Sequence, residues 1–240
     1  MNNYIIIPAR LDSSRLPNKM LKDDTGHPLI WHTVKNAKLS KKADAIVVAT
    51  DSEEIRDAVR DEANVVMTGA CSNGTERVSE ACRTLNLHGN VVNLQGDEPE
   101  VDMSCVDDLF SLFGKKYCEC RWDVATLATP ASPDEYADPN TVKVVVGGGG
   151  QAMYFSRSPI PYGGEAESLK HIGVYAYTSA FVRSLCLLKD TKAINESENL
   201  EQLLWMENGF PIKVLVRDLQ TVGIDTQEDY ERFANEYSKT

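Results

Sequence analysis

The chain has 240 residues, a formal net charge of −11 and 42% hydrophobic residues. This length allows one large domain or two closely packed lobes with a substantial apolar core, and the composition excludes the fibrous and disordered classes. The acidic balance argues against a sequence-independent nucleic-acid binder, which carries a basic face to displace counterions from phosphates. A polyanionic ligand must therefore meet cations that are gathered locally.

The start of the chain and its cysteines are typical of a cytoplasmic protein that does not bind membranes. The first residues lead directly into an apolar strand without the cationic and apolar regions of a signal peptide, and no apolar run approaches 18 residues. The six cysteines include no C-x-x-C pair, so we expect reduced, structural thiols. Cys118 and Cys120 are too few for a soft-metal site, because no second pair of ligands accompanies them.

Strand-like apolar runs alternate with helical patterns through the first half of the chain. The expected strands cover residues 4–7, 45–49, 65–67 and 91–94, and the expected helices between them cover about 29–39, 53–62 and 76–85. Pro8 is expected to stop the first strand, because proline has no N–H to donate. This βαβ series predicts a mostly parallel sheet covered on both faces, with ligands beyond the carboxyl ends of its strands.

The second half of the chain has fewer helical patterns between its strands. The expected strands cover 124–127, 142–146, 152–155 and 173–177, and a helix is expected over about 199–208. We expect a mixed sheet there, within one continuous domain that has a smaller lobe. The four consecutive glycines at 147–150 predict a mobile hairpin turn rather than a phosphate loop, because they lack the G-x-x-x-x-G-K-[ST] pattern and do not open a helix.

A cationic loop follows the first predicted strand. Arg10, Arg15 and Lys19 lie within ten positions, together with the hydroxyl of Ser13 and a second serine. Arginine can hold phosphate oxygens in pairs, whereas lysine supplies a mobile point charge. The loop is therefore the predicted triphosphate site. The alternative is a solvated basic loop on an acidic protein.

Two aspartates are candidate ligands for Mg²⁺. Asp97 follows the fourth predicted strand, which places it at the carboxyl edge of the sheet beside the cationic loop. Asp225 follows an apolar stretch far downstream. The two carboxylates could share one metal, because Mg²⁺ takes one or two carboxylates together with phosphate oxygens. Each aspartate could instead form a turn or cap a helix, and Asp225 directly precedes a helical pattern.

Two further segments carry polar residues suited to a ligand. Thr75 is expected to cap a helix whose free N–H groups, with Arg77, can face an anion or a base edge. A plain capped helix is the alternative. Arg157 ends one strand-like run and His171 begins another, so the pair could bind a sugar carboxylate and hydroxyls. For His171 a structural imidazole is the other interpretation.

The order and spacing of these residues resemble the 3-deoxy-manno-octulosonate (Kdo) cytidylyltransferases over essentially the whole chain. The N-terminal motifs are Ile-Pro-Ala-Arg, Ser-x-Arg-Leu-Pro-x-Lys, Gly-x-Pro-x-Ile, Ala-Thr-Asp, Gly-Thr-Glu-Arg and Gln-Gly-Asp-Glu-Pro, at 7–10, 13–19, 26–30, 49–51, 74–77 and 95–99. The later motifs are Tyr-Phe-Ser-Arg, His-Ile-Gly-x-Tyr, Leu-Glu-Gln-Leu and Asp-Thr-x-Glu-Asp, at 154–157, 171–175, 200–203 and 225–229. The resemblance implies a three-layer α/β/α, Rossmann-like nucleotidyltransferase domain with a mixed, mostly parallel central sheet. It further implies a nucleotide-binding half over about 1–120, and sugar-binding and dimerisation elements over about 121–240.

The resemblance also implies an activity and a set of site residues. It implies a Mg²⁺-dependent cytidylyltransferase that converts CTP and Kdo to CMP-Kdo and pyrophosphate for lipopolysaccharide biosynthesis, as a homodimer. The implied nucleotide-binding residues are Pro8, Ala9, Arg10, Ser13, Arg15, Lys19, Gly74, Thr75, Arg77 and Gln95, and the implied sugar-binding residues are Arg157, His171, Tyr175, Glu201 and Gln202. The implied catalytic residues are Arg10, Lys19, Asp97 and Asp225, of which the two aspartates hold the metal. No dedicated general base is identified.

Departures from the family pattern concern mainly the sugar. Asn73 and Asn18 stand where the family has Ser and Gly, and Leu204 where Arg often follows Leu-Glu-Gln-Leu. The segment 162–170 is short, and in this it resembles the branch of the family that acts on 8-amino-3,8-dideoxy-manno-octulosonate. That sugar or another 2-keto-3-deoxy sugar acid, such as a nine-carbon sialic acid, remains an alternative substrate. A non-catalytic nucleotide-binding protein is a further alternative, although the retained lysine and metal carboxylates argue against it.

Overall fold

The structure, a computed structural model, describes residues 1–13, 15–113, 122–188, 195–219 and 223–237. The chain divides into two compact units, of which the first comprises Met1–Phe110 and Gln220–Thr240 and the second comprises Ser111–Leu219. The expected single domain, divided near residue 120, stays a prediction. Cys118 and Cys120 lie outside the described residues. No helix among those residues is long and apolar enough to cross a membrane.

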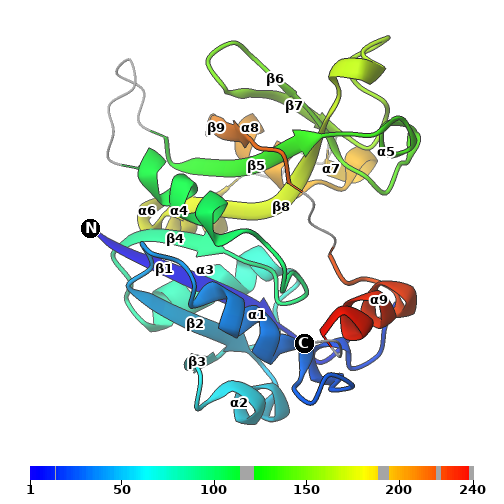
Figure 1. The fold of residues 1–240 in the computed structure, drawn as a ribbon. Helices are drawn as coiled ribbons and strands as arrows, with labels where there is room; N and C mark the ends of the chain where they lie inside the picture. The colour runs from blue at the N-terminus through cyan, green and yellow to red at the C-terminus, as the bar shows by residue number, and fades with distance from the viewer. Residues whose placement is uncertain (14, 114–121, 189–194, 220–222, 238–240) are drawn as a thin grey trace. The chain divides into compact units, whose positions relative to one another are not determined.

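The first unit contains four parallel strands in the order β3-β2-β1-β4 (Figure 1). They are β1 (Asn2–Ala9), β2 (Ala45–Thr50), β3 (Asn64–Met67) and β4 (Gly89–Asn93). Ile5, Ile6 and Ile7 of β1 are fully buried, as expected for a parallel strand that is covered on both faces. The parallel order confirms the predicted βαβ series.

Helices cover both faces of this sheet, as predicted. The helices that pack on these strands are α1 (Leu29–Ala37), α2 (Glu53–Val59) and α3 (Gly74–Thr84). The chain also forms a 3-10 turn at Lys19–Leu21 and the helices α4 (Met103–Leu112) and α9 (Gln227–Tyr237). α1 packs against α2, and Figure 1 shows α1 in front of the strands and α3 behind them. Right-handed crossovers require this arrangement. The chain crosses the sheet in one direction from β1 to β3 and in the opposite direction from β3 to β4, so α3 lies on the face opposite to α1 and α2.

The expectation that Pro8 ends the first strand is wrong. β1 continues to Ala9, and Pro8 and Ala9 stand opposite Ala49 and Thr50 of β2. Leu94 N donates to Ile6 O, so the backbone groups of Ile6, and of Pro8 two residues later, face β4. Pairing with β4 stops at Ile6. The missing N–H of Pro8 therefore removes no hydrogen bond from the sheet.

The helix that follows β3 is capped by Asn73 and not by Thr75, so that prediction is also wrong. The side chain of Asn73 accepts from Glu76 N at 2.8 Å, and the Glu76 carboxylate accepts from Ser72 N at 2.7 Å. Asparagine is among the best N-cap residues. Thr75 is the second residue of α3 and is buried.

A small core joins the C-terminal segment to the loop after β1. It consists of Leu16, Leu29, Ile224, Tyr230 and Phe233. α9 begins with a reciprocal cap in which Thr226 Oγ accepts from Asp229 N at 3.1 Å and the Asp229 carboxylate accepts from Thr226 N at 2.9 Å. The cap is therefore Thr226, which leaves the carboxylate of Asp225 for other contacts.

The second unit contains the mixed sheet predicted for the second half of the chain. Its strands are β5 (Val124–Pro130), β6 (Lys143–Val146), β7 (Ala152–Ser156), β8 (Leu169–Thr178) and β9 (Ile212–Val216). β5 is antiparallel to β8 and parallel to β9, while β6 pairs with β7 and β8 in antiparallel fashion. Its helices are α5 (Pro133–Ala137), α6 (Ser179–Ser184), α7 (Asn195–Glu198) and α8 (Glu201–Glu207), with 3-10 turns at Glu165–Glu167 and Leu185–Leu187.

The four-glycine turn between β6 and β7 is anchored to β9. Lys213 Nζ donates to Gly149 O at 2.6 Å, and Val214 N donates to Gly150 O at 2.8 Å. Gly150 has φ +73°, and a Cβ there would lie 2.3 Å from Lys213 Nζ. The predicted hairpin is present, and these bonds join its turn to β9, while its mobility stays a prediction.

Candidate functional site

A pocket of about 260 Å³ lies at the carboxyl ends of β1 and β4 in the first unit. It is formed by the loop after β1, the start of α3, the segment after β4 and the segment before α9. Among the predicted residues, the pocket is lined by Pro8, Ala9, Arg10, Ser13, Arg15, Lys19, Gly74, Arg77, Gln95, Asp97 and Asp225. Thr75 is the predicted nucleotide residue that does not line it. The pocket is also lined by residues for which the sequence predicted no role, namely Asp12, Met20, Cys71, Ser72 and Gly96.

Lys19 holds two aspartates together within this pocket. Its Nζ lies 2.6 Å from Asp97 Oδ2 and 3.2 Å from Asp225 Oδ1, and Arg15 Nη2 lies 3.0 Å from the same oxygen of Asp225. Lys19 is only 5% exposed, so it is not the mobile point charge expected from sequence. The C-terminal core and a hydrogen bond from Ile224 N to Asp97 O hold the two acidic segments side by side.

The two aspartates fit a magnesium site by the chemistry of their donors. Both carboxylates reach the same nitrogen atom, so one cation can contact both. No group of three His, Cys, Asp or Glu residues suited to a metal occurs among the described residues. The remaining ligands would be phosphate oxygens and water, which Mg²⁺ commonly retains.

Glu98 is a buried carboxyl group beside these charges that the sequence reasoning did not single out. Its Oε2 is buried and has no hydrogen-bond partner among the described residues. Burial, followed by the negative charges of Asp97 and Asp225, raises the pKa of Glu98 to about 8. Its carboxyl group is therefore mostly protonated at neutral pH, so it adds little negative charge to the aspartate pair.

Gly96 allows the segment after β4 to pass close to the end of β1. A Cβ at Gly96 would lie 3.1 Å from Met20 Sδ and 3.2 Å from Pro8 O. Thr33 Oγ1 holds this segment by donating to Gly96 O at 2.7 Å. Gln95 and Asp97, on either side of Gly96, thus both line the pocket.

Arg77 is tied into the first unit by its own hydrogen bonds. Its Nη2 lies 2.7 Å from Asp51 Oδ2, and its Nη1 donates to Thr68 Oγ1. Arg77 therefore lines the pocket with its charge already balanced by Asp51. It also borders a neighbouring cavity of about 550 Å³. Cys71 borders both cavities, and burial, followed by a hydrogen bond to Glu80, raises the pKa of its thiol to about 11, which keeps the thiol protonated.

The predicted sugar-binding residues lie in the second unit. His171 Nε2 lies 2.9 Å from Thr126 Oγ1, and its ring contacts Phe155 and Tyr175 at centroid distances of 5.2 and 5.1 Å. Burial lowers the pKa of His171 to about 3, so its imidazole is neutral. These contacts agree with the structural interpretation of this histidine.

Tyr175 presents a buried hydroxyl that has no hydrogen-bond partner among the described residues. Burial, then the charge of Glu201, raises its pKa. Its ring packs edge-on against Trp205 of α8, with centroids 5.0 Å apart. Glu201 and the buried Gln202 occupy the first turn of that helix. The aromatic contact thus joins α8 to Tyr175 of β8.

Arg157 follows β7 and is bonded on several sides. Its N donates to Glu198 Oε2 at 2.8 Å, its Nε to Glu198 O at 3.0 Å and its Nη1 to Pro139 O at 3.2 Å. Glu198, for which the sequence predicted no role, stands two residues before the Leu-Glu-Gln-Leu motif. Phe155, two residues before Arg157, packs on His171.

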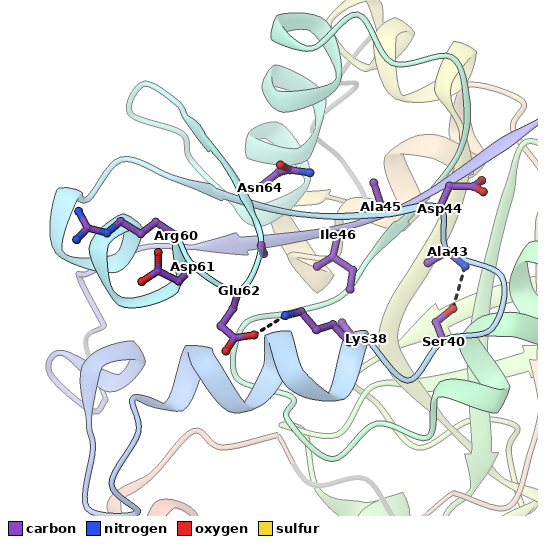
Figure 2. Close-up of a pocket in the computed structure, with 12 residues that line it drawn as sticks. Lys38, Ser40, Ala43, Asp44, Ala45, Ile46, Arg60, Asp61, Glu62 and Asn64 are labelled. Atoms are coloured by element: carbon purple, nitrogen blue, oxygen red, sulfur yellow. Dashed lines mark hydrogen bonds and ion pairs between the residues drawn. The ribbon is translucent and has the colours of Figure 1, made fainter.

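Another pocket, of about 450 Å³, lies at the opposite edge of the first unit's sheet, where β2 and β3 begin (Figure 2). Lys38 and Glu62 form an ion pair there, and Ala43 N donates to Ser40 Oγ at 3.1 Å. Ligands of parallel sheets bind beyond the carboxyl ends of the strands. This pocket is therefore not the candidate site.

Comparisons with known proteins identify relatives over nearly the full chain. A family model described as cytidylyltransferase matches residues 4–238. A 3-deoxy-manno-octulosonate cytidylyltransferase of Anaeromyxobacter sp. (strain K) is 41% identical over 234 residues, which cover 95% of this chain and 94% of the relative. One from Chlorobium limicola is 42% identical over 238 residues, with the same coverage. A solved structure of CMP:2-keto-3-deoxy-manno-octonic acid synthetase complexed with CTP has a TM-score of 0.91 and 36% identity, and covers 100% of this chain and 99% of that one.

Proposed function

The chain belongs to the cytidylyltransferase family, and we propose that it transfers CMP from CTP to 3-deoxy-manno-octulosonate, with release of pyrophosphate. It is a nucleotidyltransferase, as the resemblance in its sequence implied. The observation that carries the proposal is that Lys19, Asp97 and Asp225 meet in one pocket. In sequence, Asp97 is 78 residues and Asp225 is 206 residues from Lys19.

The nucleotide half of the reaction uses the cations after β1. Arg10, Arg15 and Lys19 bind the triphosphate and stabilise the charge that grows on the departing pyrophosphate. The anomeric hydroxyl of the sugar acid attacks the α-phosphorus in line, the bond from that phosphorus to the bridging oxygen of the β-phosphate breaks, and the hydroxyl proton passes to solvent. Asp97 and Asp225 would hold Mg²⁺, which when bound polarises the phosphoryl oxygens and offsets their charge.

We assign the sugar acid to the cluster in the second unit. The guanidinium of Arg157 pairs with the carboxylate of the sugar acid, because arginine binds carboxylates through two parallel hydrogen bonds. The buried Tyr175 hydroxyl, Glu201 and Gln202 bind sugar hydroxyls, and neutral His171 packs against Tyr175 and helps to orient its ring. The proposal includes action in the cytoplasm, as a homodimer and for lipopolysaccharide biosynthesis, by analogy with the family.

The 8-amino analogue is the alternative substrate with a specific feature in its favour. The short segment before β8 exposes Glu165 and Glu167, which could accept a cationic amino group. These side chains could equally be solvated without any ligand.

The test is pyrophosphate release with CTP, Mg²⁺ and, in parallel, Kdo, its 8-amino analogue and a sialic acid, compared as kcat/KM. A preference for Kdo supports the proposal, whereas a preference for the 8-amino analogue would make the segment before β8 the specificity element. Loss of turnover in EDTA, restored by Mg²⁺, is expected. No turnover with any of the three acids would favour the non-catalytic alternative.

A further inference from the structure

A fully buried lysine holds the peptide group of Arg157. Lys143 on β6 is 0% exposed, and its Nζ donates to the carbonyl oxygens of Asp138 at 2.8 Å, Thr141 at 2.6 Å and Arg157 at 2.7 Å. These three bonds match the three protons of an ammonium group. Lys143 thus joins the end of β7 to the loop before β6.

Glu198 binds the other side of the same residue. Its carboxylate accepts from Arg157 N and from Ser156 Oγ, and its backbone carbonyl accepts from Arg157 Nε. The carbonyl of Arg157, its N–H and the Nε of its guanidinium are therefore all hydrogen-bonded. The backbone of Arg157 is thus held on both sides, and its guanidinium is held through Nε and, by Pro139 O, through Nη1. A side chain restrained in this way loses little conformational freedom when it binds a ligand.

The charges around Lys143 are balanced. Arg157 adds a second positive charge, and the carboxylates of Asp138 and Glu198 act on Lys143 with two negative charges. Burying an ammonium group is costly even when its hydrogen bonds are satisfied, and an apolar side chain could fill a strand position at no such cost. The position of Lys143 is therefore explained better by what its bonds do for Arg157 than by packing.

We propose that Lys143 and Glu198 are positioning residues that orient Arg157 for the carboxylate of the sugar acid. The inference rests on the proposed function, in which Arg157 is the anchor for the carboxylate. It adds two residues that act through Arg157 and do not touch the substrate themselves.

The test is Lys143→Met, which keeps the length of the side chain and removes the ammonium group. We expect the KM for the sugar acid to rise at least tenfold, while the KM for CTP changes less than twofold. Lys213→Met is the matched control, because Lys213 also donates to a carbonyl in the second unit, that of Gly149, and no contact joins it to Arg157 among the described residues. The control is expected to keep both KM values.

A merely structural role for Lys143 would lower the melting temperature and the active fraction without a selective change in KM. Equal changes in both KM values, or no change in a folded variant, would overturn the inference. If Lys143→Met does not fold, Glu198→Gln decides in its place, with an expected rise of at least threefold in the KM for the sugar acid alone. Absence of wild-type turnover with every sugar acid would remove the proposed function and the inference with it, whereas normal wild-type turnover with unselective variants removes only the inference.

Discussion

Replacing Lys19 with Met would leave two carboxylates without their shared cation in the pocket at the carboxyl ends of β1 and β4. The Lys19 side chain is 6% exposed, whereas those of Asp97 and Asp225 are 25% and 41% exposed. Breaking a buried ion pair by removing one partner costs about 3–5 kcal/mol. Because water reaches both aspartates, we expect a loss at the lower end, about 3 kcal/mol. For a chain of this size, that loss lowers Tm by roughly 6–12 °C.

The same variant should gain a response to magnesium. Once the ammonium group is gone, the two carboxylates can share a divalent cation, and a site with a Kd of about 1 mM would add about 1.4 kcal/mol at about 10 mM Mg²⁺. Thermal melts of Lys19→Met with and without Mg²⁺ should then differ by roughly 3–6 °C. The wild type should respond less, because Lys19 already occupies the position between the carboxylates.

Two controls make this prediction refutable. Lys35→Met removes a half-exposed lysine that pairs with Glu62 on the surface, where such a pair contributes about 0–1 kcal/mol. The double variant Lys19→Met/Asp97→Asn should lose the response to Mg²⁺. If Lys19→Met melts at the temperature of Lys35→Met and ignores Mg²⁺, Lys19 does not hold the two carboxylates together as a charged link.

Three further outcomes are expected. Asp97→Asn should lower kcat by about 10³ or more with only a small change in Tm, because Lys19 keeps Asp225 as a partner; near-wild-type rates would remove Asp97 from the metal site. Asn73→Ala should lower the free energy of unfolding by about 1 kcal/mol in urea titrations, with Asn73→Ser close to wild type; equal losses would show that the cap hydrogen bond is unimportant. Burial lowers the pKa of His171 from 6.5 to about 3, so between these pH values the unfolded chain binds the extra proton and this residue makes stability rise with pH. His171→Gln should flatten that part of the stability–pH curve, and an unchanged slope would contradict the neutral, buried state.

The elements that form the pocket at the carboxyl ends of β1 and β4 were largely predictable because their signals are local. The first four strands are short apolar runs separated by helical patterns, and ligand residues of parallel sheets follow the carboxyl ends of such strands. Asp97 and the cationic loop were placed on this basis. The prediction for Pro8 was wrong because a missing N–H matters only where a neighbouring strand would accept its hydrogen bond. Where β4 stops pairing with β1 depends on the tertiary structure and cannot be predicted from the local sequence.

The contact between Lys19 and Asp225 depends on packing that the sequence does not show. Nothing in the local pattern around Asp225 shows that Ile224, Tyr230 and Phe233 pack against Leu16 of the loop after β1. That small core returns the C-terminal segment to the first unit. Local signals at Asp225 favoured a helix cap equally, and the cap turned out to be Thr226.

The buried lysine of the second unit was beyond sequence reasoning for a different reason. Lys143 stands in the apolar run 142–146, where a pattern of alternating faces would place a lysine in solvent. Its ammonium group is instead satisfied by carbonyls of the loop before β6 and of Arg157. The direction of loop carbonyls is set by backbone geometry that no residue pattern encodes, so neither the burial nor its purpose could be anticipated.

Under the proposed function, the pocket at the carboxyl ends of β1 and β4 lets an acidic protein hold a triphosphate without self-repulsion. Arg15 and Lys19 contribute two positive charges and Asp97 and Asp225 two negative ones, and the salt bridges among them leave no net charge. Under the proposed function, Mg²⁺ offers the two aspartates a new partner, and the triphosphate of CTP offers one to Arg15 and Lys19. The aspartates can turn to the metal only as the cations turn to the phosphates, because either exchange alone would leave partly buried charges unpaired. Binding of the metal and of the nucleotide is therefore coupled through Lys19, which makes this lysine part of the site's charge balance as well as a phosphate ligand.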